Sequence, residues 1–268
     1  TLSGTNAEYF EIVNNQVKLK DSLSAEFETK STYSITITAA DDAGHEVTLT
    51  YSLQVNDVND DPTLVNAVND QNVDEDAAFD FTLPANTFDD VDVDDTLTYT
   101  ATLSDGSALP SWLTFNAATQ TFTGTPLNAN VGDISVKVTA TDSAAATVSD
   151  IFTLTVANTN DAPTAIVLSA SIFDETTAGV VIGDLATADV DNLPGDSHEY
   201  TLSCTDADSF EIINGQLKLK DSLTADYETQ SSYSVTVTAT DAAGKTTSQE
   251  FTLGVNDTND DPTAIGLS

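Results

Sequence analysis

Acidic side chains recur in this chain in three kinds of short cluster. The first is a stretch rich in Asn and Asp just before a proline, as in NDVNDDP, NTNDAP and NDTNDDP. The second is a pair of aspartates separated by one valine, and the third is a pair of acids separated by one aromatic residue. The residues concerned are Asp57, Asn59, Asp60, Asn158, Asn160, Asp161, Asp257, Asn259 and Asp260; Asp90, Asp92, Asp189 and Asp191; and Glu26, Glu28, Asp226 and Glu228.

Acids two residues apart on an extended chain point the same way, so each pair presents two carboxylates to one point. Carboxylates held about 4 Å apart repel by ~4 kcal/mol per pair at an effective dielectric constant near 20, and several converging pairs therefore need a cation. Calcium prefers six to eight oxygen ligands, whereas zinc prefers His and Cys, of which the chain has 2 and 1. An isolated pair of this kind is usually a solvated turn. Recurrence in register favours calcium binding instead.

Composition excludes two classes of partner. The chain has 44 acidic and 7 basic residues in 268, and its net charge is −37. All the basic residues are lysines, so nothing can contact phosphates in the bidentate way of arginine. We therefore expect binding neither to nucleic acid nor to anionic membranes.

The chain repeats itself. Phe10–Thr63 aligns without a gap on Phe210–Thr263, and more than half of the paired residues are identical. Prolines at the same place in the linker mark a period of roughly 100 residues, which favours tandem β-domains over a solenoid of short repeats. The expected domains, named here repeat one, repeat two and repeat three, are 1–61, 62–162 and 163–262, and 263–268 opens a following unit.

Repeat one starts at the position equivalent to Thr201 of repeat three, so the sequence is expected to be a fragment. A less favoured explanation is that another chain donates the first strands. A sandwich that lacks its first strands is expected to expose the apolar side chains of Ile35, Ile37 and Leu49. The single cysteine, Cys204, aligns with Gly4 and is expected to be a small buried or strand residue.

Apolar residues alternate with polar ones along the repeats, for example from Tyr33 to Ala39, from Ile134 to Ala140 and from Tyr233 to Ala239. This period of two predicts strands with one buried face. Gly, Asn, Asp and Pro lie between these segments as turn formers. The expected fold class is an all-β sandwich in each repeat.

These motifs resemble those of cadherins. DVNDDP is similar to the cadherin linker DxNDxxP shortened by one residue, AEFE and ADYE resemble the LDxE motif, and ADVD resembles DxD. Asp41 and Asp241 resemble the terminal xDxG aspartate, and Glu175 matches the glutamate of the first strand. Residues 88–126 resemble the dystroglycan-type cadherin-like domain.

The resemblance implies tandem Ig-like, cadherin-like Greek-key sandwiches in a linear rod, as in the extender region of secreted bacterial surface adhesins, including the RTX type. It also implies calcium ligands at each junction. For the junction of repeats one and two these are Glu26, Glu28, Asp57, Asn59 through its carbonyl, Asp60, Glu75, Asp90, Asp92 and Asp142. For the next junction they are Asn158, Asn160, Asp161, Glu175, Asp189, Asp191 and Asp241, and a half-site follows with Asp226, Glu228, Asp257, Asn259 and Asp260.

The second junction is expected to hold fewer or weaker ions. Asn158 replaces an aspartate there, and the positions aligned with the acidic pair of repeat three are Leu127 and Ala129.

The sequence thus predicts a spacer stiffened by calcium between neighbouring domains of one long chain, and no enzyme. The alternative is a module that binds polysaccharide or other cells with calcium. Trp112 could stack on a sugar, but its apolar alternating context favours a core position. Glycoside hydrolysis needs one acid kept protonated in an apolar cleft, whereas these acids lie among other anions. His45 and His198 have no nearby nucleophile in a known motif.

Overall fold

The computed structural model describes residues 1–93, 95–191 and 197–259, and it is all-β apart from three short 3-10 helices in those ranges. Every described strand pairing joins two strands of the same repeat. By its internal contacts the chain divides into two units, 1–157 and 158–268, so repeats one and two share a unit. Among the described residues, no helix is long and apolar enough to cross a membrane.

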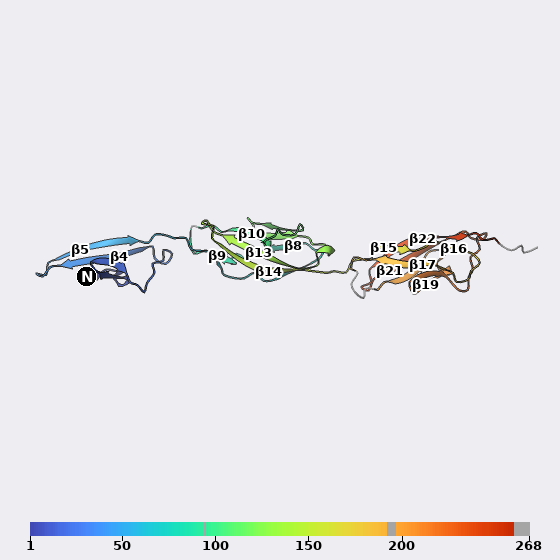
Figure 1. Cartoon of the computed structure of the whole chain (residues 1–268), viewed down its shortest axis with the longest axis horizontal. Coiled ribbons are helices and arrows are strands. Elements are labelled where there is room, and N and C mark those ends of the chain that lie inside the picture. The colour runs from blue at the N-terminus through green and yellow to red at the C-terminus, as the bar shows by residue number, and fades with distance from the viewer. Residues whose placement is uncertain (94, 192–196, 260–268) are drawn as a thin grey trace, which may run out of the picture. The chain divides into compact units, whose positions relative to one another are not determined.

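Repeat one has fewer described strands than repeats two and three. Its larger sheet has the order β1-β4-β5, with β4 and β5 adjacent in Figure 1, and β2 and β3 form a separate hairpin. Two residues with positive φ, Asn14 and Asn15, make the hairpin turn, as expected for a two-residue loop. The elements are β1 (Leu2–Ser3), η1 (Ala7–Tyr9), β2 (Phe10–Val13), β3 (Gln16–Leu19), β4 (Thr32–Ala40) and β5 (Glu46–Gln54).

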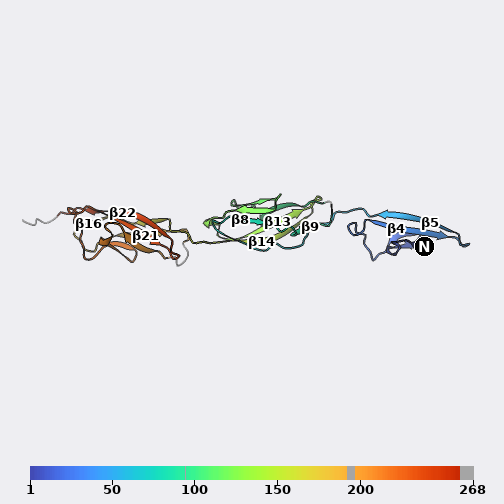
Figure 2. The ribbon, with the colours of Figure 1, turned by 180° about the vertical axis from the view of Figure 1, so that it is seen from behind.

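Repeat two has two main sheets, β10-β13-β14-β7 and β11-β12-β8, with β6 and β9 paired separately. The long strands β13 and β14 run along its length (Figure 2). The elements are β6 (Thr63–Leu64), β7 (Gln71–Asp74), β8 (Phe79–Thr82), β9 (Phe88–Asp89), β10 (Thr98–Leu103), β11 (Leu113–Asn116), β12 (Thr121–Gly124), η2 (Asn128–Asn130), β13 (Gly132–Thr141) and β14 (Thr147–Ala157).

Repeat three has two four-stranded sheets, β16-β22-β21-β18 and β15-β17-β20-β19. Its last strand pairs in parallel with its second, as the last strand of repeat two does with β7. The elements are β15 (Ala165–Leu168), β16 (Ile172–Asp174), β17 (Val181–Ala188), β18 (Glu199–Ser203), η3 (Ala207–Ser209), β19 (Phe210–Ile213), β20 (Gln216–Leu219), β21 (Ser232–Thr240) and β22 (Thr246–Asn256).

The all-β prediction is confirmed, and the predicted alternation fills the cores. Phe122 and Phe152 are fully buried in repeat two. Trp112 is half-buried and packs against the same cluster, so the core position expected for the tryptophan is confirmed in part. In repeat three Leu217 and Leu253 are fully buried. Cores of this kind stabilise each sandwich mainly through burial of apolar surface.

The expected exposure in repeat one is confirmed only in part. Leu49 is 55% exposed, but Ile35 is buried because the β2–β3 hairpin places Phe10 and Val17 beside it around a cavity of about 240 Å³. Ile37 lines the same cavity and is half-buried.

Cys204 is exposed and lies just after β18 with φ 89°, so the expectation of a buried or strand position is wrong. Its sequence counterpart Gly4 has a similar φ of 97°, a left-handed conformation that suits glycine.

Candidate metal centres

Backbone amides fix the carboxylates at the N-terminal end of repeat two. The amide of Asp60 donates to Asp92 Oδ2 at 2.9 Å, and the amide of Asp92 donates to Asp90 Oδ1 at 3.0 Å. The side-chain amide of Asn59 donates to Asp142 Oδ2 at 3.0 Å. The linker therefore ties the loop after β9 to the turn after β13, and it aims three carboxylates at one region.

Two groups of converging carboxylates result. Glu28, Asp57 and Asp92 form the first group, in which each residue brings one oxygen within 4.8 Å of the others. Asp90, Asp95 and Asp142 form the second group in the same way. A hollow of about 280 Å³ is lined by Asp57, Asn59, Asp92 and Asp95.

Two buried oxygens in these groups, Asp90 Oδ2 and Asp92 Oδ1, accept no hydrogen bond from any described residue. A buried carboxylate oxygen is normally hydrogen-bonded, because desolvation without a partner is costly. Carboxylates that converge with unpartnered oxygens are what a hard divalent cation binds, so these residues fit calcium.

The pKa of Glu28 reflects this crowding. Its own backbone hydrogen bond lowers the pKa, but partial burial and the negative charges of Asp57, Asp60 and Asp92 outweigh that bond, and the pKa is raised. The side chain thus lies in a negative field produced by the linker and by repeat two.

Sequence reasoning missed Asp95. Its carboxylate accepts hydrogen bonds from the amide and hydroxyl of Ser143, which place it beside Asp142. The signal was the continuation of the acidic run, DDVDVDD, beyond the Asp-Val-Asp motif. The counterpart of Asp95 in repeat three is Asp196, which lies outside the described residues.

Two predicted acids of repeat one, Glu26 and Asp60, join none of the carboxylate groups found in the described ranges, and Asp60 acts instead through its backbone amide. Glu26 makes no such contact with repeat two among the described hydrogen bonds. Its side chain is exposed, and its carbonyl accepts from the amide of Lys30 at 2.9 Å.

A third group lies at the C-terminal end of repeat three and contains Glu175, Asp226 and Glu228. Glu175 is only 2% exposed and accepts bonds of 2.6 Å from the amides of Tyr227 and Thr258. These two amides lower the pKa of Glu175, so it is ionised at neutral pH. Of the other predicted members, Asp257 and Asn259 are exposed, and Asp260 lies outside the described residues.

The positions of Glu175 and Glu75 correct two expectations. Glu175 follows β16, which runs parallel to the last strand, so it lies where repeat three ends and not where it begins. Glu75 follows β7 in the same way, and its amide donates to the carbonyl of Ala157 at 2.9 Å. It is therefore separated from Asp142 by the length of β13, about 33 Å at ~3.3 Å per residue. Glu75 cannot join the carboxylates at the N-terminal end of repeat two.

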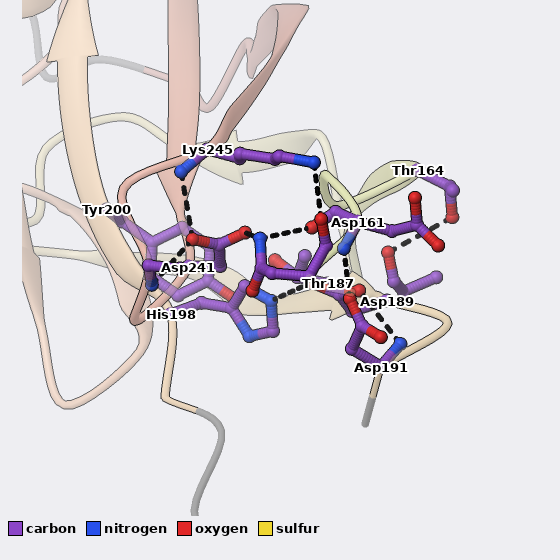
Figure 3. Close-up of polar contacts among 12 residues, drawn as sticks. Asp161, Thr164, Thr187, Asp189, Asp191, His198, Tyr200, Asp241 and Lys245 are labelled. Carbon is purple, nitrogen blue, oxygen red and sulfur yellow. Dashed lines mark hydrogen bonds and ion pairs between the residues drawn. The ribbon is translucent and has the colours of Figure 1, made fainter. Parts of the chain in front are cut away.

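The N-terminal end of repeat three repeats the scaffold of repeat two (Figure 3). The amide of Asp161 donates to Asp191 Oδ2, and the amide of Asp191 donates to Asp189 Oδ1 at 3.1 Å. Asn160 Nδ2 donates to Asp241 Oδ2 at 2.9 Å, and this bond is the main reason why the pKa of Asp241 is lowered.

Comparisons with known proteins identify the fold of the chain. Residues 61–157 match the He_PIG family, described as Putative Ig domain. Crystal structures of the extracellular cadherin domains 1–4 of protocadherin gamma B7 and of the protocadherin gamma B4 extracellular domain superpose with TM-scores of 0.62 and 0.67, at 21% and 19% identity. Mouse cadherin-23 EC22–24 superposes with a TM-score of 0.66 at 15% identity. The fold is cadherin-like.

The cadherin-like fold holds over almost the whole chain, because these superpositions cover 95%, 97% and 93% of it. In turn the chain spans 66%, 43% and 83% of the three cadherin structures. No curated protein matches the sequence.

Proposed function

We propose that this chain is part of the extender of a secreted bacterial cell-surface adhesin, and that calcium bound at the linkers between its repeats stiffens it. Two buried oxygens, Asp90 Oδ2 and Asp92 Oδ1, accept no hydrogen bond from the described part of the chain, and they carry the proposal. When bound, calcium supplies the positive charge and the flexible oxygen coordination that such carboxylates need.

The carboxylates at the linker make the approach of repeats one and two depend on bound calcium. Glu28 comes from repeat one and Asp92 from repeat two, with Asp57 of the linker between them in sequence, and their carboxylate oxygens converge within 4.8 Å. Repulsion among them favours separation of the two repeats, whereas a shared cation favours their approach. Asp60 and Asn59 keep the carboxylates of repeat two in place through their hydrogen bonds.

The extracellular setting follows from the same chemistry. Extracellular modules bind calcium at roughly 10⁻⁴–10⁻³ M, which suits the calcium concentration outside cells. The spacer would thus be loose during export and stiff at the cell surface, and its partners would be neighbouring repeats of its own chain. Direct binding of polysaccharide or cells has less support, since Trp112, the residue best suited to stack on sugars, packs against the core of repeat two.

Calorimetric titration of the chain with calcium tests the proposal. The expected result is saturable binding in the millimolar range or tighter, with at least one site lost in the Asp92→Asn variant. Asp80→Asn is the matched control, because Asp80 is an exposed residue of β8 outside the described carboxylate groups. Absence of calcium binding, or equal binding by both variants, would contradict it.

A further inference from the structure

Three of the sequence differences between the equivalent acidic ends of repeat two and repeat three give repeat three a hydrogen-bond donor. In each end a linker amide donates to the second aspartate of the Asp-Val-Asp motif, and an Asn side chain donates to the aspartate after the long strand. The pairs that carry these three differences are Asp57 and Asn158, Leu97 and His198, and Ala146 and Lys245. At each pair repeat three has a hydrogen-bond donor where repeat two has an acid or an apolar side chain.

The exchange of Asp57 for Asn158 gives the second aspartate of the Asp-Val-Asp motif a hydrogen-bond donor. In repeat two, Asp57 adds a carboxylate close to Asp92, and Asp92 Oδ1 is buried without a hydrogen bond from the described residues. In repeat three, Asn158 Nδ2 donates to Asp191 Oδ1 at 3.0 Å. An amide donor thus stands in repeat three where repeat two has repulsion.

The exchange of Leu97 for His198 gives the first aspartate of the Asp-Val-Asp motif a hydrogen-bond donor. Leu97 and His198 are equivalent because each directly precedes the strand that pairs with the long central strand. His198 Nε2 lies 3.1 Å from Asp189 Oδ2, and a carboxylate can only accept, so the imidazole donates. The matching oxygen of repeat two, Asp90 Oδ2, has no such donor among the described residues.

The third exchange introduces a full positive charge. Ala146 and Lys245 are equivalent, since their backbone amides donate to Asp142 Oδ1 and Asp241 Oδ1 at 2.7 and 2.9 Å. The ammonium of Lys245 donates to the carbonyl oxygen of Asn160. Figure 3 shows the lysine side chain extended past Asp241, with its end at the linker.

The backbone carbonyl of Asn160, which accepts the hydrogen bond from Lys245, has a counterpart in repeat two. In repeat two the equivalent oxygen belongs to Asn59, which the resemblance to cadherins makes a calcium ligand. An ammonium and a divalent cation both bind carbonyl and carboxylate oxygens, and a lysine held by the chain needs no calcium in solution.

We propose that Lys245 is a tethered cation that replaces a divalent ion at the N-terminal end of repeat three, so that Asn158–Asp161 are ordered there without calcium. The proposal rests on the proposed function in one respect, since it takes the equivalent place in repeat two as a calcium site. It makes adjacent linkers of one chain differ in their response to calcium.

Hydrogen exchange of two equivalent amides, measured by NMR on the full chain in chelator, tests this. The amide of Asp161 should exchange about tenfold or more slowly than that of Asp60, because its acceptor is already held in place. Lys245→Met keeps the aliphatic stem and should abolish the difference, whereas Lys245→Arg should preserve it. The reciprocal variant Ala146→Lys should slow exchange at Asp60.

Calcium titration of the same variants completes the test. Lys245→Met should bind one more calcium ion than the unmodified chain, and Ala146→Lys one fewer. Equal protection of both amides in chelator, or protection of Asp161 that survives Lys245→Met, would overturn the proposal. If the unmodified chain binds no calcium, the proposed function fails, but the exchange rates in chelator still decide the role of Lys245.

Discussion

Replacing Asp90 by asparagine should have opposite effects with and without calcium. Asp90 Oδ1 accepts from the amide of Asp92, and an asparagine carbonyl can keep that bond. Asp90 Oδ2 is buried and has no described hydrogen-bond partner. The new NH₂ group would occupy its place and could donate to Asp95 or Asp142, so a repulsion becomes an attraction.

The size of the effect follows from the distances. A pair of charges 4.8 Å apart repels by about 3.5 kcal/mol at an effective dielectric constant of 20 and by about 0.9 kcal/mol in water. Asp90 is half-buried and has two such neighbours, so we expect Asp90→Asn to stabilise repeat two in chelator by about 1–2 kcal/mol. This corresponds to a rise in melting temperature of roughly 5–10 °C.

With calcium the sign should reverse. A ligand present at a hundred times its dissociation constant stabilises a protein by about 2.7 kcal/mol, and the variant should lose most of this because it lacks one charged ligand. Trp112 is the only tryptophan and packs against the core of repeat two, so its fluorescence follows this repeat alone during thermal unfolding. Asp80→Asn again serves as the control. If Asp90→Asn lowers the melting temperature in chelator as well, the account of unpartnered, repelling carboxylates is refuted.

Three further predictions concern stability. Glu175→Gln should lower the melting temperature at pH 7, because the lowered pKa of Glu175 means that its ionised form stabilises the fold. This stabilisation is complete above the ordinary pKa of about 4.5 and is lost as the pH falls through the pKa of the folded state. In circular dichroism melts, the variant should therefore lose this part of the acid sensitivity. Cys204→Gly should stabilise repeat three by about 1 kcal/mol in urea unfolding, since φ 89° strains a cysteine and not a glycine, and no gain would contradict that strain. Phe122→Ala should cost repeat two about 3–5 kcal/mol in urea unfolding followed by Trp112, and a loss below 1 kcal/mol would contradict the buried aromatic core.

Much of the fold could be predicted from local pattern. The alternation from Ile134 to Ala140 corresponds to β13, and Val136, Val138 and Ala140 are all fully buried as it requires. Such a pattern depends only on which face of a strand is covered, and the sequence carries that information directly.

The positions of Glu75 and Glu175 could not be predicted in the same way. Each follows a short strand near the start of its repeat, so sequence order suggests the N-terminal end. Parallel pairing with the last strand carries both to the opposite end. The direction of that pairing is a property of the folded sheet and leaves no mark in local spacing.

The donors of repeat three were missed for a related reason. His198 and Lys245 are far apart in sequence and belong to no motif, and only the pairing of β18 with β21 and the turn before β22 bring them to the same acidic end. The sequence predicts Asn158 only as a lost ligand, whereas its contact with Asp191 makes it a hydrogen-bond donor as well.

The most direct test of the central claim is small-angle X-ray scattering of the chain in calcium and in chelator. The account predicts a longer maximum dimension and a narrower distribution of interdomain distances in calcium, and a more compact and broader ensemble in chelator. Identical scattering curves under both conditions, at calcium concentrations that saturate binding, would contradict the claim that calcium stiffens the linkers.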